Sequence, residues 1–171
     1  DLDKPAPFVA FWIEEDIEGK PVDSSIVESQ LMQDFLASGF RVSDDKPRKI
    51  FTDQNEAEKT AEKVNADILL LGNAKSNFVT DKDLGGLTSY RAILSLKVLK
   101  ANSKEVISTV SDFSGGVDIT KEAAAKSSLK RVAEKVGKNF AQKIYETLKT
   151  QSTVLMKISP LADLNELNTL N

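Results

Sequence analysis

The sequence predicts an α/β (α+β) domain with a mixed sheet of about five strands and two or three helices packed mainly on one face. Short apolar runs alternate with segments whose apolar residues recur every three or four positions, as in strands separated by helices. Two later segments alternate apolar and polar residues across a short turn, which indicates a hairpin. The expected order is strand, helix, strand, short helix, strand, two hairpin strands and a long helix.

The first strand is predicted at Phe8–Ile13, an apolar and aromatic run that follows two prolines. Glu14–Ser24 is expected to be an acidic loop, because it carries many charges together with glycine and proline. Ser25 and Glu28 then have the spacing of a capping box, in which each side chain accepts a hydrogen bond from the other residue's backbone N–H. A helix is therefore predicted to begin here.

Gly39 is expected to end this helix, because glycine readily adopts the left-handed conformation of the residue after a helix. Phe40 would then contact Phe35 across the helix end, and Phe40–Ser43 is predicted to be a brief strand. A second capping pattern predicts a short helix from Asp53 and Glu56, with apolar residues at Ala57, Ala61 and Val64.

Ile68–Leu71 is apolar on both sides, as expected for a central strand. Ser89–Lys100 and Glu105–Phe113 are predicted to form an antiparallel hairpin. Because side chains alternate along a strand, the residues of the first hairpin strand are expected to divide between two faces. The core face would hold Ala92, Leu94, Leu96 and Val98, and the second, half-polar face would hold Arg91, Ser95 and Lys97.

The longest helix is predicted from Thr120 to about Lys149, because an apolar stripe continues through this segment at helical spacing. Beyond it, Thr153–Ile158 resembles a strand, and the leucines that follow resemble a short helix. We therefore expect a single domain at residues 1–150, with residues 151–171 a tail strand and short helix that either begin a second domain or pack back on the first. The stripe consists of Leu129, Val132, Val136, Phe140, Ile144 and Leu148.

The composition argues against several kinds of chemistry. Histidine and cysteine are both absent, which removes the usual general base near neutral pH, the thiolate nucleophile and the commonest metal ligands. No phosphate-binding glycine motif occurs, and Gly85–Gly86 and Gly115–Gly116 are expected to serve turns or bulges. The formal charge of -3 is spread along the chain and does not indicate a nucleic-acid surface. No catalytic site, cofactor or metal is predicted.

The longest apolar run, Ile68–Leu71, is much shorter than the roughly 20 residues that span a bilayer. The chain begins at Asp1 without methionine or an apolar leader, so we expect a mature or trimmed form of a longer protein.

The candidate binding residues are charged. Asp81 and Asp83 are the best carboxylate pair for a hydrolase, but the lysine between them favours a solvated hairpin tip. Trp12 could stack a base or a sugar, although an aromatic residue in such a strand is more often core. Contact with a partner is predicted at Glu14, Glu15, Asp16, Arg91 and Lys97.

Taken together, these elements resemble a group of bacterial envelope domains. The group comprises the curli secretion lipoprotein, penicillin-binding-protein activator lipoproteins, the middle domain of the flagellar assembly protein T and the amino-terminal domain of the translocation protein TolB. The resemblance is carried by Ser25–Leu31 with Gly39–Val42, by Ala66–Gly72, by Tyr90–Val98 with Lys104–Ile107, and by Ala123, Ala124, Ala125, Leu129 and Ala133.

This resemblance implies a non-catalytic module for protein–protein interaction or assembly, periplasmic or associated with the outer membrane, whose partners are other envelope proteins. The lipid-anchoring cysteine of such lipoproteins is not in this sequence, so membrane attachment is expected only through an anchor outside it. The apolar hairpins of the curli pore have no counterpart here either, and no pore is expected. The alternative function is a domain that binds a small ligand or a nucleotide derivative.

Overall fold

The computed structural model describes the backbone of residues 5–43, 54–63 and 65–169, and side chains as far as residue 151 except at 54, 57, 60 and 61. The predicted order of helices and strands is confirmed, with one short strand added. In chain order the elements are β1 (Phe8–Ile17), β2 (Lys20–Pro21), α1 (Ile26–Ala37), β3 (Arg41–Val42), α2 (Gln54–Lys63), β4 (Ile68–Thr80), β5 (Thr88–Lys100), β6 (Val106–Asp118) and α3 (Lys121–Thr169).

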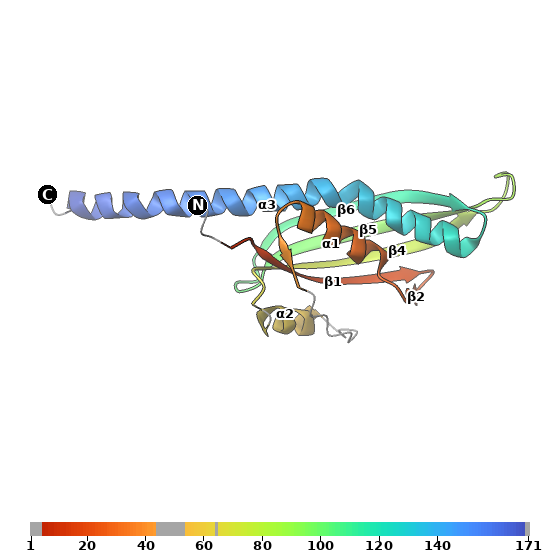
Figure 1. Cartoon of the computed structure of the whole chain (residues 1–171), viewed down its shortest axis with the longest axis horizontal. Helices are drawn as coiled ribbons and strands as arrows, with labels where there is room; N and C mark the ends of the chain where they lie inside the picture. Colours follow the sequence, from red (N-terminus) through yellow and green to blue (C-terminus); the bar gives the residue numbers. More distant parts are fainter. Residues whose placement is uncertain (1–4, 44–53, 64, 170–171) are drawn as a thin grey trace.

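The strands form a mixed sheet of six strands in the order β2-β1-β4-β5-β6, and β3 pairs with β1 outside this path. β1 runs parallel to β3 and β4, whereas the other pairs are antiparallel. α1 and α3 lie together against one face of the sheet (Figure 1), which we call the covered face. The predicted mixed sheet with helices mainly on one face is therefore confirmed.

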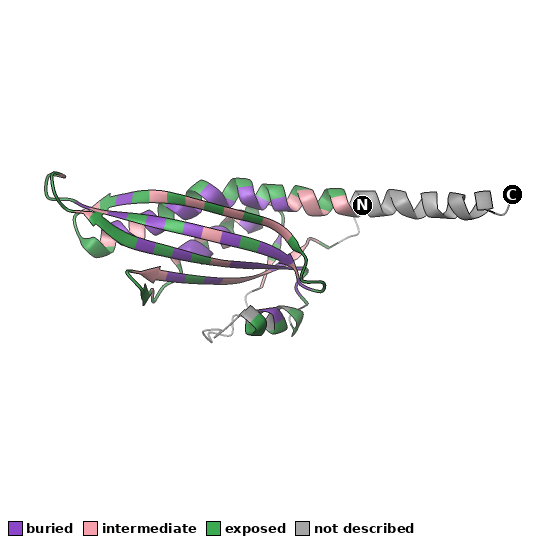
Figure 2. Ribbon diagram, turned by 180° about the vertical axis from the view of Figure 1, so that it is seen from behind, coloured by how far each residue is buried: buried purple, intermediate pink, exposed green. Residues whose placement is uncertain are grey.

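The core lies between the covered face and the two helices. Burial alternates along the strands (Figure 2), because successive side chains point to opposite faces. The four core-face residues predicted on β5, Ala92, Leu94, Leu96 and Val98, are all buried in this core. Val9, Ile13, Leu31, Phe35, Leu129, Val132 and Ile144 surround them from β1, α1 and α3.

The end of α1 follows the prediction. Gly39 has φ of 107°, in the left-handed region that glycine adopts without steric penalty. The Phe35 and Phe40 rings lie 4.9 Å apart between centroids, and the Phe40 N–H donates to the Phe35 carbonyl at 3.1 Å. The brief strand predicted after the helix is confirmed as β3.

The acidic segment after the first strand is not the loop that we predicted. β1 continues to Ile17 and turns back through Glu18 and Gly19 into β2. Both turn residues have positive φ, 52° and 82°, as a two-residue type I′ hairpin turn requires. Ile13 and Ile17 continue the alternation of inward-pointing side chains along the strand. The carboxylates between them made this alternation difficult to recognise in the sequence.

At the other end of the sheet, α2 lies on the opposite side from α1 and α3 (Figure 1). It contacts β4 near a second apolar cluster that is built on Ala66, Leu69, Leu71 and Leu99, with Trp12 packed against it. The predicted short helix is confirmed. The expected cap at Asp53, the residue Val64 and the side chains of Ala57 and Ala61 lie outside the described residues.

β4, β5 and β6 form one continuous antiparallel meander of 13-residue strands. The predicted hairpin is confirmed as β5 and β6, but the central strand is longer than predicted and itself forms a hairpin with β5. Asp81 and Asp83 are exposed at the tip of that hairpin, and Gly85 and Gly86 have positive φ there, as expected of a turn.

Gly115 and Gly116, however, serve no turn or bulge: both lie in β6 in regular register with β5. A Cβ added to Gly116 would overlap the Ser128 backbone nitrogen and lie 2.6 Å from the Ala124 oxygen. Gly116 is therefore glycine because α3 passes directly over it.

α3 begins after Thr120, whose hydroxyl accepts from the Ala123 N–H at 3.1 Å. Its backbone is helical through Thr153–Ile158, so the strand predicted there is wrong. A short apolar run fits either structure, and extending an existing helix adds a hydrogen bond for each residue fixed. That residues 151–171 begin a second domain stays a prediction.

Candidate functional site

The face of the sheet opposite α1 and α3, which we call the open face, collects four of the five residues predicted to contact a partner. Glu14 and Asp16 reach it from β1, where they lie opposite Asn73 and Lys75 of β4. Arg91 and Lys97 reach it from β5 and are exposed. Strand alternation explains this grouping, because residues two apart share a face. The carboxylates lie on β1 and the cations on β4 and β5.

Glu15, the fifth predicted residue, points the other way. It lies on the covered face opposite Ala74 and is buried. Its Oε1 accepts from the N–H groups of Ile26 at 2.9 Å and Val27 at 2.7 Å, and its Oε2 accepts from Glu28 at 3.3 Å. Contact between Glu15 and a partner stays untested, but in this structure its carboxylate holds the beginning of α1.

These bonds also correct the predicted capping box. The Ser25 side chain makes no cap hydrogen bond, because the Glu15 carboxylate occupies the N–H groups that a cap would use. Burial raises the pKa of Glu15 above 4.5, more than the three N–H groups lower it. This side chain therefore has a structural role in α1.

A cluster of three side chains stands out on the open face at β5 and the edge strand β6: Arg91, Ile93 and Phe113, which we call the Arg91 cluster. Ile93 and Phe113 are directly opposite each other on β5 and β6, and they are 48% and 50% exposed. The Arg91 guanidinium carbon lies 4.0 Å from the centre of the Phe113 ring. This is stacking distance for a guanidinium on an aromatic face.

Lys135 of α3 supports Phe113 from the edge of the sheet. Its Nζ lies 5.0 Å from the centre of the ring and donates to the Asp112 carboxylate and the Phe113 carbonyl, both at 3.0 Å. Phe113 is thus contacted by both Arg91 and Lys135 although half of its surface faces solvent. We identified Phe113 from the sequence only as the end of a strand. Its register opposite Ile93 was the signal that could have found it.

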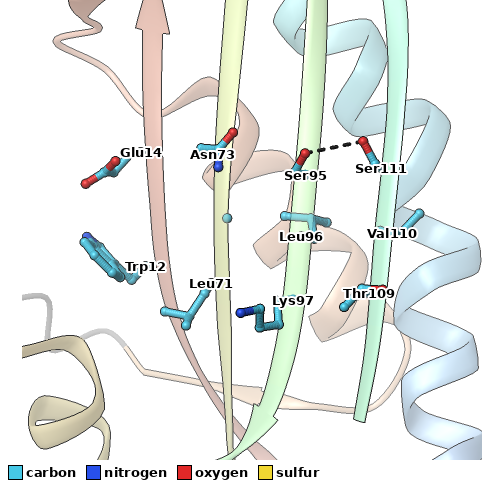
Figure 3. Close-up of a pocket in the computed structure, with 11 residues that line it drawn as sticks. Trp12, Glu14, Leu71, Asn73, Ser95, Leu96, Lys97, Thr109, Val110 and Ser111 are labelled. Atoms are coloured by element: carbon cyan, nitrogen blue, oxygen red, sulfur yellow. Dashed lines mark hydrogen bonds between the residues drawn. The ribbon is translucent and has the colours of Figure 1, made fainter. Parts of the chain in front are cut away.

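Next to the Arg91 cluster, the open face contains a hollow of about 590 Å³. Trp12 and Glu14 lie at one side of it and Thr109 and Ser111 at the other, with side chains of β4 and β5 between them (Figure 3). Trp12 is half-buried, because it both packs against the second apolar cluster and lines the hollow. The remaining lining comes from Leu71, Gly72, Asn73, Ser95, Leu96, Lys97 and Val110.

The hollow holds one carboxylate, Glu14, and one ammonium, Lys97, among neutral hydroxyl and amide groups. Among the residues that the structure describes, no three acidic side chains gather in a way that could hold a metal ion. No helix within the described ranges is both long and apolar enough to cross a membrane. The arrangement offers hydrogen bonds, an aromatic surface and a balanced charge, which are means of binding.

A comparison with known protein families assigns the chain to one of them. Residues 7–145 match the model of the C-terminal domain of TP0693-like lipoproteins. The chain belongs to this family. It is consequently a domain of a cell-envelope lipoprotein, periplasmic or outer-membrane associated, and the resemblance to envelope α/β domains is confirmed. No curated protein sequence matches the chain.

Solved structures share the fold of this lipoprotein domain. The PelC dodecamer from Paraburkholderia phytofirmans has a TM-score of 0.53 at 15% identity, over 81% of this chain and 86% of that one. Protein XCC0632 from Xanthomonas campestris has a TM-score of 0.51 at 11% identity, over 88% and 89%. The LpoB C-terminal domain from Salmonella enterica is a weaker match that does not by itself establish a shared fold, with a TM-score of 0.47 at 12% identity, over 65% and 84%.

Proposed function

We propose that this lipoprotein domain is a non-catalytic docking module that binds another envelope protein through the Arg91 cluster on its open face. The observation that carries the proposal is the stacked and half-exposed pair of Arg91 and Phe113 with Ile93 beside it. Aromatic and arginine side chains are enriched among the residues that dominate binding energy at protein interfaces.

The position of the cluster supports a protein partner. Ile93 and Phe113 form an apolar centre, and Asp16 and Lys75 continue the same transverse row of the sheet toward β1. An apolar centre with a charged border is the usual arrangement of an interface, in which the border sets orientation and partner choice. Lys135 fixes Phe113 before binding, which lowers the entropy lost when the interface forms.

The absence of histidine and cysteine from the sequence supports a role in binding instead of catalysis. Membership of a lipoprotein family agrees with a structural or adaptor role in the envelope. Glu14, Asp16 and Lys97 are proposed to contact the same partner at the border of the interface.

The test is photo-cross-linking in the native cells, using the full-length protein with a photoreactive amino acid at Ile93 and, as the control, at Gln142. Gln142 is exposed on α3, on the helical side of the domain. We expect one envelope protein to be trapped from Ile93 and not from Gln142. The same cross-link should fall at least tenfold when Phe113→Ala is introduced, as for other residues that dominate an interface.

Equal trapping from both positions would contradict a defined docking face. Loss of the cross-link would be uninformative if Phe113→Ala unfolded the domain, so its thermal midpoint is measured beside the wild type. A cross-link unchanged by a folded Phe113→Ala variant would show that the Arg91 cluster is not the anchor.

A further inference from the structure

We infer that the hollow beside Trp12 is a binding site for a neutral glycan, a chain of sugar rings without phosphate or sulfate groups. The inference does not depend on the docking function proposed above. It depends on the chemistry of the side chains that surround the hollow and on the position of the Trp12 ring among them.

The hollow joins an aromatic surface to groups that can both donate and accept hydrogen bonds. Hydroxyls of Ser95, Ser111 and Thr109 and the amide of Asn73 have this double capacity, as do the hydroxyls of a sugar. Glu14 adds an acceptor and Lys97 a donor. The C–H face of a sugar ring carries partial positive charge and packs against the negative face of an aromatic ring such as that of Trp12.

The register of the strands places these groups in two adjacent rows across the sheet. Trp12, Leu71, Lys97 and Thr109 form one row, and Glu14, Asn73, Ser95 and Ser111 form the other. Adjacent strands are about 4.8 Å apart, so hydrogen-bonding groups recur at that interval along the second row, whereas Leu71 interrupts them in the first. A repeating ligand that crosses the strands would meet such groups again and again.

The hydroxyls retain capacity for a ligand. Ser95 and Ser111 lie 3.3 Å apart, oxygen to oxygen. An ordinary O–H···O hydrogen bond is about 2.7–2.8 Å, so their mutual bond is weak and leaves both groups open to better partners. A ligand hydroxyl seated between the two serines could bond to both.

Other classes of ligand fit the lining less well. A nucleotide phosphate needs several cations or a glycine-rich cradle, whereas this hollow has the single cation Lys97 and the carboxylate Glu14. A wholly apolar ligand would leave the hydroxyls and the Asn73 amide desolvated without partners, at about 1–3 kcal/mol for each group. An extended peptide would find no main-chain pairing, because the backbone groups beneath the hollow are paired between strands.

The sequence provides a reporter for the test, since Trp12 is its one tryptophan. The 171-residue chain is titrated with cellotetraose, maltotetraose and chitotetraose while the intrinsic fluorescence of Trp12 is followed. The first two carry only hydroxyls and the third adds acetamido groups, so the comparison identifies the class of sugar. We expect at least one of them to give a saturable change with half-saturation below about 1 mM, a binding free energy stronger than about -4 kcal/mol.

Two variants and two controls locate the site. Asn73→Ala and Ser111→Ala each remove an exposed polar group from the hollow and should raise the half-saturation concentration at least tenfold. Gln142→Ala removes an exposed amide from α3 and should leave it unchanged. Phe113→Ala should also leave it unchanged, because Phe113 does not line the hollow, and this separates the glycan site from the Arg91 cluster.

Three results would each overturn the inference. One is the absence of a saturable response to all three tetrasaccharides below that concentration. Another is unchanged binding by the Asn73→Ala and Ser111→Ala variants. The third is an equal response to glucose 6-phosphate, because the hollow would then recognise a phosphate group.

Discussion

The two faces of the sheet have the same strands and opposite kinds of surface. The covered face packs against α1 and α3 of the same chain. It has buried apolar side chains, a glycine where α3 passes over β6 and a buried carboxylate at the start of α1. The open face has exposed charges, a half-exposed aromatic cluster and a hollow. Because strands alternate, a structural residue and a candidate binding residue are often neighbours in the sequence, and pairs of neighbours can test the difference.

The neighbouring glycines of β6 should show the largest difference. Gly116→Ala would force α3 away from the sheet, because the new methyl group would overlap backbone atoms of Ser128 and Ala124. We expect the free energy of unfolding to fall by roughly 2–3 kcal/mol, as for overpacked cores. Thermal and urea unfolding would measure this change.

Gly115→Ala is the matched control, since its nearest neighbour would be the Tyr90 oxygen at 3.8 Å. Its methyl group would make only an ordinary van der Waals contact, and stability should stay within about 0.5 kcal/mol of wild type. Similar losses in both variants would show that β6 does not hold the described register against α3.

The neighbouring glutamates of β1, Glu14 and Glu15, should show the second-largest difference in their effect on stability. Glu15→Ala leaves the N–H groups of Ile26, Val27 and Glu28 without their acceptor, and unsatisfied buried donors destabilise a protein by about 1–3 kcal/mol. Glu14→Ala changes only an exposed side chain of the open face, so a change within about 0.5 kcal/mol is expected. Urea unfolding of both variants gives the comparison, and equal effects would refute the assignment of Glu15 to the helix cap.

The pH dependence of stability sharpens the same contrast. The pKa of Glu15 is raised in the folded state by burial, so the native protein binds this proton more tightly than the unfolded chain. Stability must therefore fall as pH rises from 4.5 through the raised folded-state pKa, and it recovers as pH is lowered again. Glu15→Gln should lose this component while keeping a carbonyl acceptor for α1.

The measurement is urea unfolding of wild type and Glu15→Gln at a series of pH values across that interval. The wild type should become less stable relative to the variant as pH increases. Glu14→Gln, which changes the exposed neighbour on the open face, is measured in parallel as the control. Parallel pH curves for wild type and Glu15→Gln would contradict the raised pKa.

The features of the fold and the site that could be predicted from the sequence were those determined by residues close together in the chain. The inward face of β5 followed from strict alternation at Ala92, Leu94, Leu96 and Val98, and that parity also placed Arg91 and Lys97 together. Gly39 ended α1 as predicted, since a helix end is determined by a few adjacent residues. These predictions needed no knowledge of distant parts of the chain.

The failures involved distant partners or ambiguous patterns. Glu15 reaches an N–H group 11 residues away, whereas the predicted capping box considered only Ser25 and Glu28. The hollow depends on the parallel pairing of β1 with β4, and nothing in either segment specifies that partner. Thr153–Ile158 lies on a continuing helix although its residues also suit a strand. The acidic end of β1 was interpreted as a loop, because its consecutive charged residues do not show the apolar and polar alternation that is typical of a strand.

The smallest expected effect concerns Lys135, the side chain that links α3 to the Arg91 cluster. Its hydrogen bond to Asp112 lowers the pKa of that carboxyl below 3.8, and the Phe113 N–H contributes a second bond. A lowered pKa stabilises the fold above 3.8, and this stabilisation disappears as pH falls through the folded-state value. In Lys135→Met the pKa of Asp112 should rise toward 3.8 without reaching it, because the Phe113 N–H remains. Carboxyl NMR titration measures the pKa of Asp112 directly.

Lys130→Met is the control. Lys130 pairs with Glu134 on the same helix, so its replacement should leave the pKa of Asp112 unchanged. An unchanged Asp112 pKa in Lys135→Met would mean that α3 does not fix the Phe113 edge of the open face.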